Sequence, residues 1–163
     1  MIHIRRAGSI DARPMADLLN EIIRVGGTTA FTTEITTDFI TERMATEADR
    51  SAWHIAEKED GELVGFQYFL PKSKLPPEAC DIATFVRIGE TGLGIGSKLF
   101  QVTCDAAVSL GYGWINATIR ADNESGLTYY QSRGFETYVV DKDIRLDNGL
   151  VVDRVNKRFD LKR

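Results

Sequence analysis

The sequence predicts a mixed α/β fold, in which about four helices flank a central, mostly antiparallel sheet of about seven strands. Two observations support this prediction. Pairs of apolar or alternating segments joined by tight turns predict hairpins, and strand–helix–strand successions predict crossovers. Hairpins mixed with crossovers imply a sheet of mixed direction. Because no repeat, linker or low-complexity segment interrupts the sequence, we expect a single domain over residues 1–163.

The N-terminal third is expected to contain one strand and two helices. Residues 2–6 (IHIRR) alternate in polarity and predict an edge strand. Over residues 11–25, apolar side chains recur at helical spacing, and a pair of glycines then ends the predicted helix. The threonine-rich segment 28–37 is expected to be a loop that does more than connect, because it is long. A shorter helix is predicted at about 37–48.

The middle of the chain predicts a hairpin and a third strand. Residues 51–71 contain two apolar or alternating runs on either side of Asp60-Gly61, which is a strong turn dipeptide. Three prolines then mark a loop. The segment CDIATFVRI, residues 80–88, predicts the strand that leads to a glycine-rich stretch.

The C-terminal half alternates between helices and strands. Helices are predicted at about 94–109 and 123–134, and strands at 114–120, 136–146 and 150–161, the last two joined by an Asp-Asn-Gly turn. The first of these helices is expected to bury one apolar face, made of Ile95, Leu99, Val102, Ala106 and Leu110.

The composition is that of an ordinary soluble globular protein, with 43% hydrophobic and 27% charged residues. A net charge of −4 argues against nucleic acid as a partner, and the absence of a long apolar run argues against a membrane span. Two histidines, with Cys80 and Cys104 far apart in sequence, predict neither a metal site nor a disulfide. The N-terminus lacks the apolar core of a signal peptide, so a cytoplasmic location is the default expectation.

Three glycines within five residues, in TGLGIGSKLF (91–100), directly precede a predicted helix. Glycine lets backbone amides converge, and the first helical turn carries unpaired N–H groups and partial positive charge, so Gly92, Gly94 and Gly96 suit an anion. A tight strand-to-helix turn explains the same glycines. The spacing matches neither a P-loop nor the dinucleotide-binding fingerprint, whose third glycine falls at Ser97. A phosphate bound here would belong to another cofactor, and a nucleotide-binding protein is the weakest alternative.

The strand DIATFVRI, the loop TGLGIG and the helix after it resemble the coenzyme A-binding motif of GCN5-related N-acetyltransferases. That motif is Gln/Arg-x-x-Gly-x-Gly/Ala. Gly94 and Gly96 fill its two glycine positions, whereas Thr91 stands where Gln or Arg is usual. Backbone amides can still bind a diphosphate with this substitution.

The later segment NESGLTYYQSRGF resembles a second motif of the same family, Asn-x-x-Ala-x-x-x-Tyr-x-x-x-Gly-Phe. Asn123, Tyr130, Gly134 and Phe135 are in register, and Gly126 replaces the alanine. The two motifs occur in the expected order, and the predicted elements agree with that fold across nearly the whole chain. Within the family, the region 20–95 most resembles the phosphinothricin-type, small-amine acetyltransferases.

The resemblance implies an acyl-CoA-dependent N-acetyltransferase. The primary amine of a small-molecule or amino-acid-like acceptor would attack the thioester of acetyl-CoA directly, without a metal. Tyr130 is the candidate acid for the departing thiolate, because a phenol stays protonated at neutral pH. Asp81, at the start of the strand that leads to the glycines, is the candidate base, directly or through a water. The family also implies a homodimer through the last two strands.

The resemblance implies further site residues. The threonine-rich segment lies where the family builds its acceptor wall, which makes Thr28, Thr29 and Phe31 candidate substrate-binding residues. The implied cofactor contacts are Phe85, Val86, Arg87, Thr91, Gly92, Leu93, Gly94, Ile95, Gly96, Ser97, Asn123 and Tyr130.

Each of these side chains also has a structural explanation. Tyr130 lies at helical spacing from Leu127 and suits a core contact, Asp81 suits an exposed strand start, and Asn123 suits a helix cap. A non-catalytic acyl-CoA sensor or protein-interaction module on the same fold therefore stays open beside the enzyme.

Overall fold

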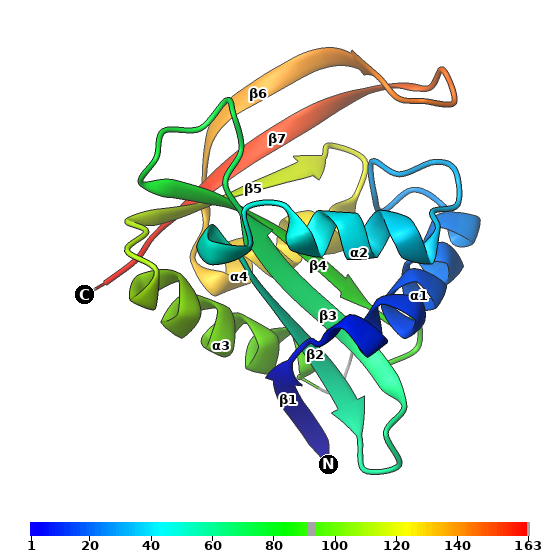
Figure 1. Cartoon of the computed structure of the whole chain (residues 1–163). Coiled ribbons are helices and arrows are strands. Elements are labelled where there is room, and N and C mark those ends of the chain that lie inside the picture. The colour runs from blue at the N-terminus through cyan, green and yellow to red at the C-terminus, as the bar shows by residue number, and fades with distance from the viewer. Residues whose placement is uncertain (91–93, 163) are drawn as a thin grey trace.

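A computed structural model describes residues 1–90 and 94–162 of the chain and contains one seven-stranded sheet (Figure 1). The strand order across the sheet is β1-β2-β3-β4-β5-β7-β6, and every neighbouring pair is antiparallel except β4 and β5. The mixed, mostly antiparallel sheet expected from the sequence is thus confirmed. The strands are β1 (Ile2–Arg6), β2 (Ala52–Lys58), β3 (Leu63–Leu70), β4 (Ala79–Val86), β5 (Trp114–Arg120), β6 (Glu136–Arg145) and β7 (Val151–Asp160).

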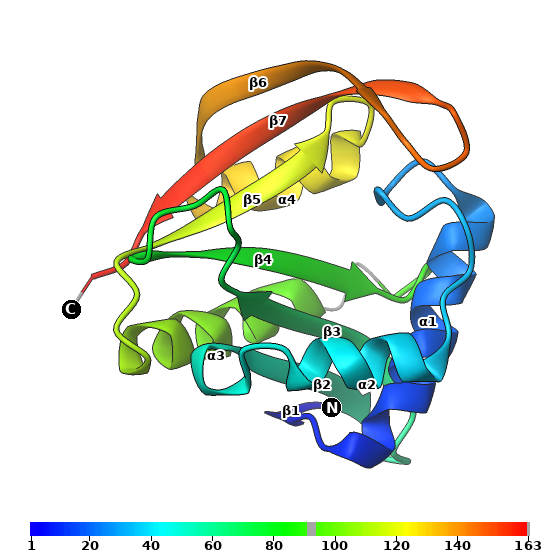
Figure 2. The ribbon, with the colours of Figure 1, turned by 45° about the horizontal axis from the view of Figure 1, so that its top comes forward.

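Two helical layers enclose the sheet. Side chains of α1 and α2 pack with Trp53, Phe66 and Tyr68 on one face, whereas α3 and α4 pack on the other face against residues such as Phe69 and Ile115. Figure 2 shows α1 and α2 in front of the strands and α3 and α4 behind them. The α-helices of the described residues are α1 (Ala12–Val25), α2 (Thr37–Ala45), α3 (Ile95–Ser109) and α4 (Glu124–Arg133).

Two details of the helices differ from the sequence prediction. Helix α2 ends at Ala45 rather than near residue 48, because the chain turns through a left-handed conformation at Glu47 before a short 3₁₀ turn. The buried face of α3 is also rotated. Val102, Ala106 and Leu110 are only partly buried, because the row that faces the sheet continues through a polar residue; that row is Ile95, Leu99, Thr103 and Ala107.

The parallel strands β4 and β5 separate soon after they meet. They pair only at Ala79↔Trp114, Cys80↔Ile115 and Asp81↔Asn116. Beyond this point β4 continues to Val86 and stays paired with β3, while β5 stays paired with β7. Figure 2 shows the two strands diverging. The β5-facing side of β4 from Ile82 to Val86 therefore has no strand partner in the described chain.

Candidate active site

The gap between β4 and β5 opens into a cleft of about 960 Å³. Its walls come from the end of α1 and the segment after it, from α2, from β3 to β5 and β7, from the start of α3, and from residues along the whole of α4. The gap thus brings together residues that the sequence places more than a hundred positions apart. The predicted site residues on its wall are Thr28, Thr29, Phe31, Asp81, Phe85, Val86, Gly94, Gly96, Ser97, Asn123 and Tyr130.

The remaining predicted site residues lie elsewhere. The Ile95 side chain is fully buried beside Ala56 and Val64, so only its main chain is available. Arg87 follows the end of β4, and its guanidinium pairs with Glu62 at 2.8 Å and with Glu21 at 3.2 Å outside the cleft. Three further predicted residues lie outside the described part of the chain, namely Thr91, Gly92 and Leu93.

Helix α3 starts at the cleft with the geometry that an anion site requires. Gly94 caps the helix in a left-handed conformation, with φ of 72°, and no described residue beyond its chain neighbours lies within 4 Å of the position a Cβ would take. The first-turn amides that follow have no acceptor within the helix. Ser97 and Arg133 also face this end of the cleft, and the Arg133 Nη1 donates to the Ser97 hydroxyl. Open space, unpaired amides and a nearby cation together suit a phosphate group.

Tyr129 joins the start of α3 to α4. Its hydroxyl donates to the Gly96 carbonyl at 2.7 Å and accepts from Gln67 Nε2 at 3.1 Å. A Cβ on Gly96 would lie 2.6 Å from Cε1 of the Tyr129 ring. The second glycine of the first motif is therefore needed for this close approach. The sequence gave no sign of these hydrogen bonds.

Tyr130 is almost fully buried at the cleft, and its hydroxyl lies 2.8 Å from the Thr84 hydroxyl. Its ring packs edge-on against Phe135 of the second motif. Burial raises the pKa of Tyr130 well above the usual value for a phenol, so the hydroxyl keeps its proton at neutral pH. Thr84 on β4 was missed by the sequence analysis, because nothing in a threonine within a strand indicates a site.

Asp81 lies at the last point of contact between β4 and β5. Its Oδ1 accepts a hydrogen bond from Asn116 Nδ2 at 2.8 Å, and its Oδ2 lies 3.7 Å from the Lys72 ammonium. Burial raises the pKa of the Asp81 carboxyl, while Lys72 and Asn116 oppose that rise. Because strand side chains alternate, Asp81 and Thr84 point to opposite faces of the sheet. Asp81 and Tyr130 thus approach the cleft from its two sides.

The segment after α1 is fastened to the opposite wall of the cleft. Arg120 Nη1 donates to the Thr29 carbonyl at 3.0 Å, and Asn123 Nδ2 donates to the Thr28 carbonyl at 3.1 Å. Asp122 holds the buried Arg120 guanidinium through two hydrogen bonds of 3.0 and 2.8 Å. The predicted acceptor segment is therefore positioned by the end of β5 and by the start of α4.

Asn123 uses the rest of its side chain as a helix cap. Its Oδ1 accepts from the Gly126 amide at 3.0 Å and from the Ser125 hydroxyl at 3.1 Å. A Cβ at Gly126 would lie only 2.4 Å from Asn123 Nδ2. This contact explains why glycine stands where the second motif has alanine.

Basic side chains outnumber acidic ones on the cleft wall, although the chain as a whole carries a net charge of −4. Arg43 on α2 stands over the rings of Phe39 and Tyr68, at 5.5 and 5.9 Å from their centres. It forms no ion pair with any described residue, and its Nε is buried without a hydrogen-bond partner. The charged wall residues are Arg43, Lys72, Arg120, Arg133 and Arg154 against Asp81 and Glu124.

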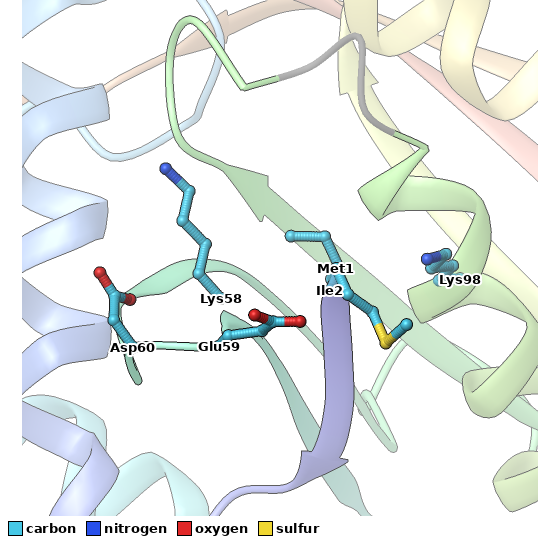
Figure 3. Close-up of a pocket in the computed structure, with 6 residues that line it drawn as sticks. All are labelled: Met1, Ile2, Lys58, Glu59, Asp60 and Lys98. Atoms are coloured by element: carbon cyan, nitrogen blue, oxygen red, sulfur yellow. The ribbon is translucent and has the colours of Figure 1, made fainter.

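A second, smaller hollow of about 500 Å³ lies beside β1 and the turn between β2 and β3 (Figure 3). Its lining offers no serine, threonine, cysteine or histidine, and Lys98 of α3 lines this hollow rather than the cleft. Among residues 1–90 and 94–162, no group of acidic, histidine or cysteine side chains could hold a metal ion. None of the helices in that part of the chain is long and apolar enough to cross a membrane.

Comparisons with known proteins agree with this geometry. The model of the acetyltransferase (GNAT) family matches residues 16–135. No curated protein sequence matches the chain. Among solved structures, a GNAT superfamily phosphinothricin acetyltransferase from Sinorhizobium meliloti in complex with acetyl-CoA is 20% identical, with a TM-score of 0.87 over 98% of this chain and 88% of its own.

Two further solved structures share the fold. An N-acetyltransferase from Staphylococcus aureus Mu50 is 21% identical, with a TM-score of 0.86 over 99% of each chain. A ribosomal-protein-alanine N-acetyltransferase from Brucella melitensis is 20% identical, with a TM-score of 0.88 over 98% of this chain and 99% of its own. Proteins with different acceptors in their names thus have the same backbone.

We expect the Arg120→Met substitution to loosen the segment that carries Thr28 and Thr29. It removes the hydrogen bond to the Thr29 carbonyl and the pair with Asp122, which should speed amide hydrogen exchange there about tenfold. Mass-spectrometric hydrogen exchange of residues 28–33 measures the effect. Arg158→Met is the matched control, because Arg158 pairs with Asp160 at the same i, i+2 spacing without touching this segment. Equal rates of amide hydrogen exchange at residues 28–33 in both variants would contradict the role of Arg120 in holding this segment.

Proposed function

The chain belongs to the GNAT acetyltransferase family, and we propose that it transfers an acetyl group from acetyl-CoA directly to the primary amine of a small molecule. The observation that carries this proposal is the gap between β4 and β5, which ends at the open first turn of α3 within one cleft. Acetyl-CoA presents a diphosphate, an extended amide-bearing arm and a thioester, and the gap offers a matching feature for each.

The described residues suit acetyl-CoA, the acetyl donor, in chemical character. The first-turn amides of α3, with Gly94 leaving the approach open, would hold the diphosphate, and Ser97 and Arg133 would add polar contacts. The main chain of β4 from Ile82 to Val86 would pair with the arm, because strand-like pairing is the contact that this open strand side can offer. The Tyr129 hydrogen bonds keep the start of α3 in place.

The two candidate proton-transfer groups lie on opposite sides of the gap. Asp81 would accept the proton of the attacking amine, directly or through a water. Its raised pKa makes the carboxylate a stronger base. Tyr130 would give a proton to the departing sulfur, since burial keeps its hydroxyl protonated. This arrangement lets an amine approach from the α1–α2 face while the thiol leaves on the α3–α4 face.

We propose that the acceptor carries an anionic group besides its amine, as an amino acid does. Arg43 supports this, because a cleft guanidinium that forms no ion pair with a described residue is a ready partner for a carboxylate. Thr28, Thr29 and Phe31 would form the wall around the acceptor. The sequence resemblance to the phosphinothricin-type branch and the solved structure of that name point in the same direction.

We further propose a homodimer formed through β6 and β7 in the cytoplasm. Large apolar side chains are exposed on this edge of the sheet, as an interface between two copies would require. The two cysteines are free thiols, as is usual in a reducing compartment. The exposed residues are Tyr138, Val139, Val140, Leu150 and Val151.

We expect Tyr130→Phe to lower kcat for acetyl transfer about 100-fold while the Kd for acetyl-CoA changes less than about threefold. The variant keeps the buried ring and removes only the proton donor. Thiol release measures the rate, and calorimetric titration measures binding. Tyr129→Phe is the comparison, because it loses hydrogen bonds to the backbone and to Gln67 but leaves the acid intact. A large loss of kcat in Tyr129→Phe with none in Tyr130→Phe would contradict the assignment.

An acceptor panel tests the substrate class. Alanine, methionine and phenylalanine are compared with ethylamine, 3-methylthiopropylamine and phenethylamine, which differ from them only by the carboxylate. We expect kcat/KM to favour each amino acid by about tenfold or more, the size of one charge-assisted interaction. Binding of acetyl-CoA without turnover on any amine would instead favour the non-catalytic sensor.

The matched variant for this panel is Arg43→Met. It should lower kcat/KM for each amino acid about tenfold more than for the matching simple amine, so that the preference is lost. Arg50→Met is the control, because Arg50 also stands over an aromatic ring, that of Tyr112 at 4.3 Å, but lies outside the cleft. A preference that survives Arg43→Met would assign the anionic group to another residue.

A further inference from the structure

A chain of side-chain hydrogen bonds starts at Asp81 and crosses three more strands of the sheet. Asn116, which is 2% exposed, donates from Nδ2 both to Asp81 Oδ1 at 2.8 Å and to the Thr118 hydroxyl at 3.0 Å. The Thr118 hydroxyl donates in turn to Asn156 Oδ1 at 2.8 Å. Asn156 Nδ2 donates to Asp141 Oδ2 at 2.9 Å. The chain thus runs from β4 through β5 and β7 to β6.

The donor and the acceptor of every hydrogen bond in this series are fixed. An ionised carboxylate only accepts, so Asn156 must present its NH₂ group to Asp141 and its carbonyl to Thr118. The single hydroxyl proton of Thr118 is then used, and Thr118 can only accept from Asn116. Asn116 is consequently required to turn its NH₂ group toward Thr118 and Asp81.

Tyr138 on β6 closes the arrangement from the other side. Its hydroxyl donates to the Asn116 carbonyl, so turning the amide over would break this hydrogen bond. The Tyr138 ring packs edge-on against Trp114, with ring centres 5.8 Å apart. The sequence gave no sign of this contact, since the residues come from three separated segments and match neither motif.

We propose that Asn116, held by Tyr138 and Thr118, is a positioning residue that fixes the orientation and the charge state of the Asp81 carboxylate. The Asn116 amide donates to the ionised form of Asp81 and offsets part of the cost of burying it. The effect of Asn116 on the pKa of Asp81 does not depend on the proposed function. Only its consequence for the rate of acetyl transfer rests on that function.

Several other charged or titratable side chains also affect the pKa of Asp81, and the variants used in a test must leave them in place. The Lys72 ammonium on the loop before β4 is the nearest cation, at 3.7 Å, and Arg43 on α2 adds positive charge. Neither of these two cations forms a hydrogen bond with the Asn116 amide. The remaining titratable groups around the carboxyl are Tyr68 on β3, Cys80 on β4, Tyr130 on α4 and Tyr138 itself.

The test is a carbon-13 NMR titration of the Asp81 carboxyl, assigned by its loss in Asp81→Asn. In Tyr138→Phe the ring and its packing remain, but the Asn116 carbonyl is released and the amide can turn. We expect the pKa of Asp81 to rise by about 0.5 to 1 unit. Thr118→Val, which removes the acceptor for the other amide proton, should raise the pKa of Asp81 in the same direction.

Tyr112→Phe is the matched control, because it removes a buried hydroxyl bond to the Arg50 carbonyl without touching this chain. An unchanged pKa of Asp81 in Tyr138→Phe, a fall, or an equal rise in the control would overturn the proposal. If Asp81 is the base, the acid limb of the pH–rate profile should shift upward by the same amount. A shift in the titration without a shift of that limb would reject Asp81 as the base while leaving the positioning role intact.

Discussion

The separation of β4 from β5 is the constraint on which the rest of the structure depends. Two parallel strands that pair at only three positions leave one side of β4 without a partner, and unpaired main-chain groups are costly unless solvent or a ligand satisfies them. The sheet tolerates this opening because β3 holds β4 on one side and β7 holds β5 on the other. The cleft, the exposed first turn of α3 and the two sides from which Asp81 and Tyr130 approach all follow from this one break in the ladder.

Hydrogen bonds from the second motif then fix the walls of the opening. Tyr129 reaches across to the Gly96 carbonyl at the start of α3, and Asn123 reaches the Thr28 carbonyl of the predicted acceptor segment. The two glycines that permit these contacts, Gly96 and Gly126, have no room for a Cβ. The motif residues therefore do more than offer groups to a ligand. They hold the donor end and the acceptor end of one cleft in a fixed relation.

Local sequence signals were sufficient for the secondary structure and for part of the site. Alternation, helical spacing and turn dipeptides identified all the strands and helices of the sheet and its layers, because each signal lies within a few residues. The resemblance to two motifs singled out Gly94 and Tyr130 as site residues, and both line the cleft. What escaped the sequence is non-local. The apolar face of α3 was misassigned because a threonine, Thr103, occupies a buried position. The hydrogen bonds behind Asp81 depend on which strands become neighbours, and the place of Arg43 depends on how α2 packs on the sheet. Neither can be read from a single segment.

The most direct test of the account is a crystal structure of the protein with acetyl-CoA. We expect the diphosphate within about 3 Å of the backbone amides at the start of α3, and the extended arm paired with the main chain of β4 between Ile82 and Val86. The thioester should then lie between Asp81 and Tyr130. A donor bound in the hollow beside β1, or a gap between β4 and β5 that closes around protein side chains when acetyl-CoA binds, would contradict it.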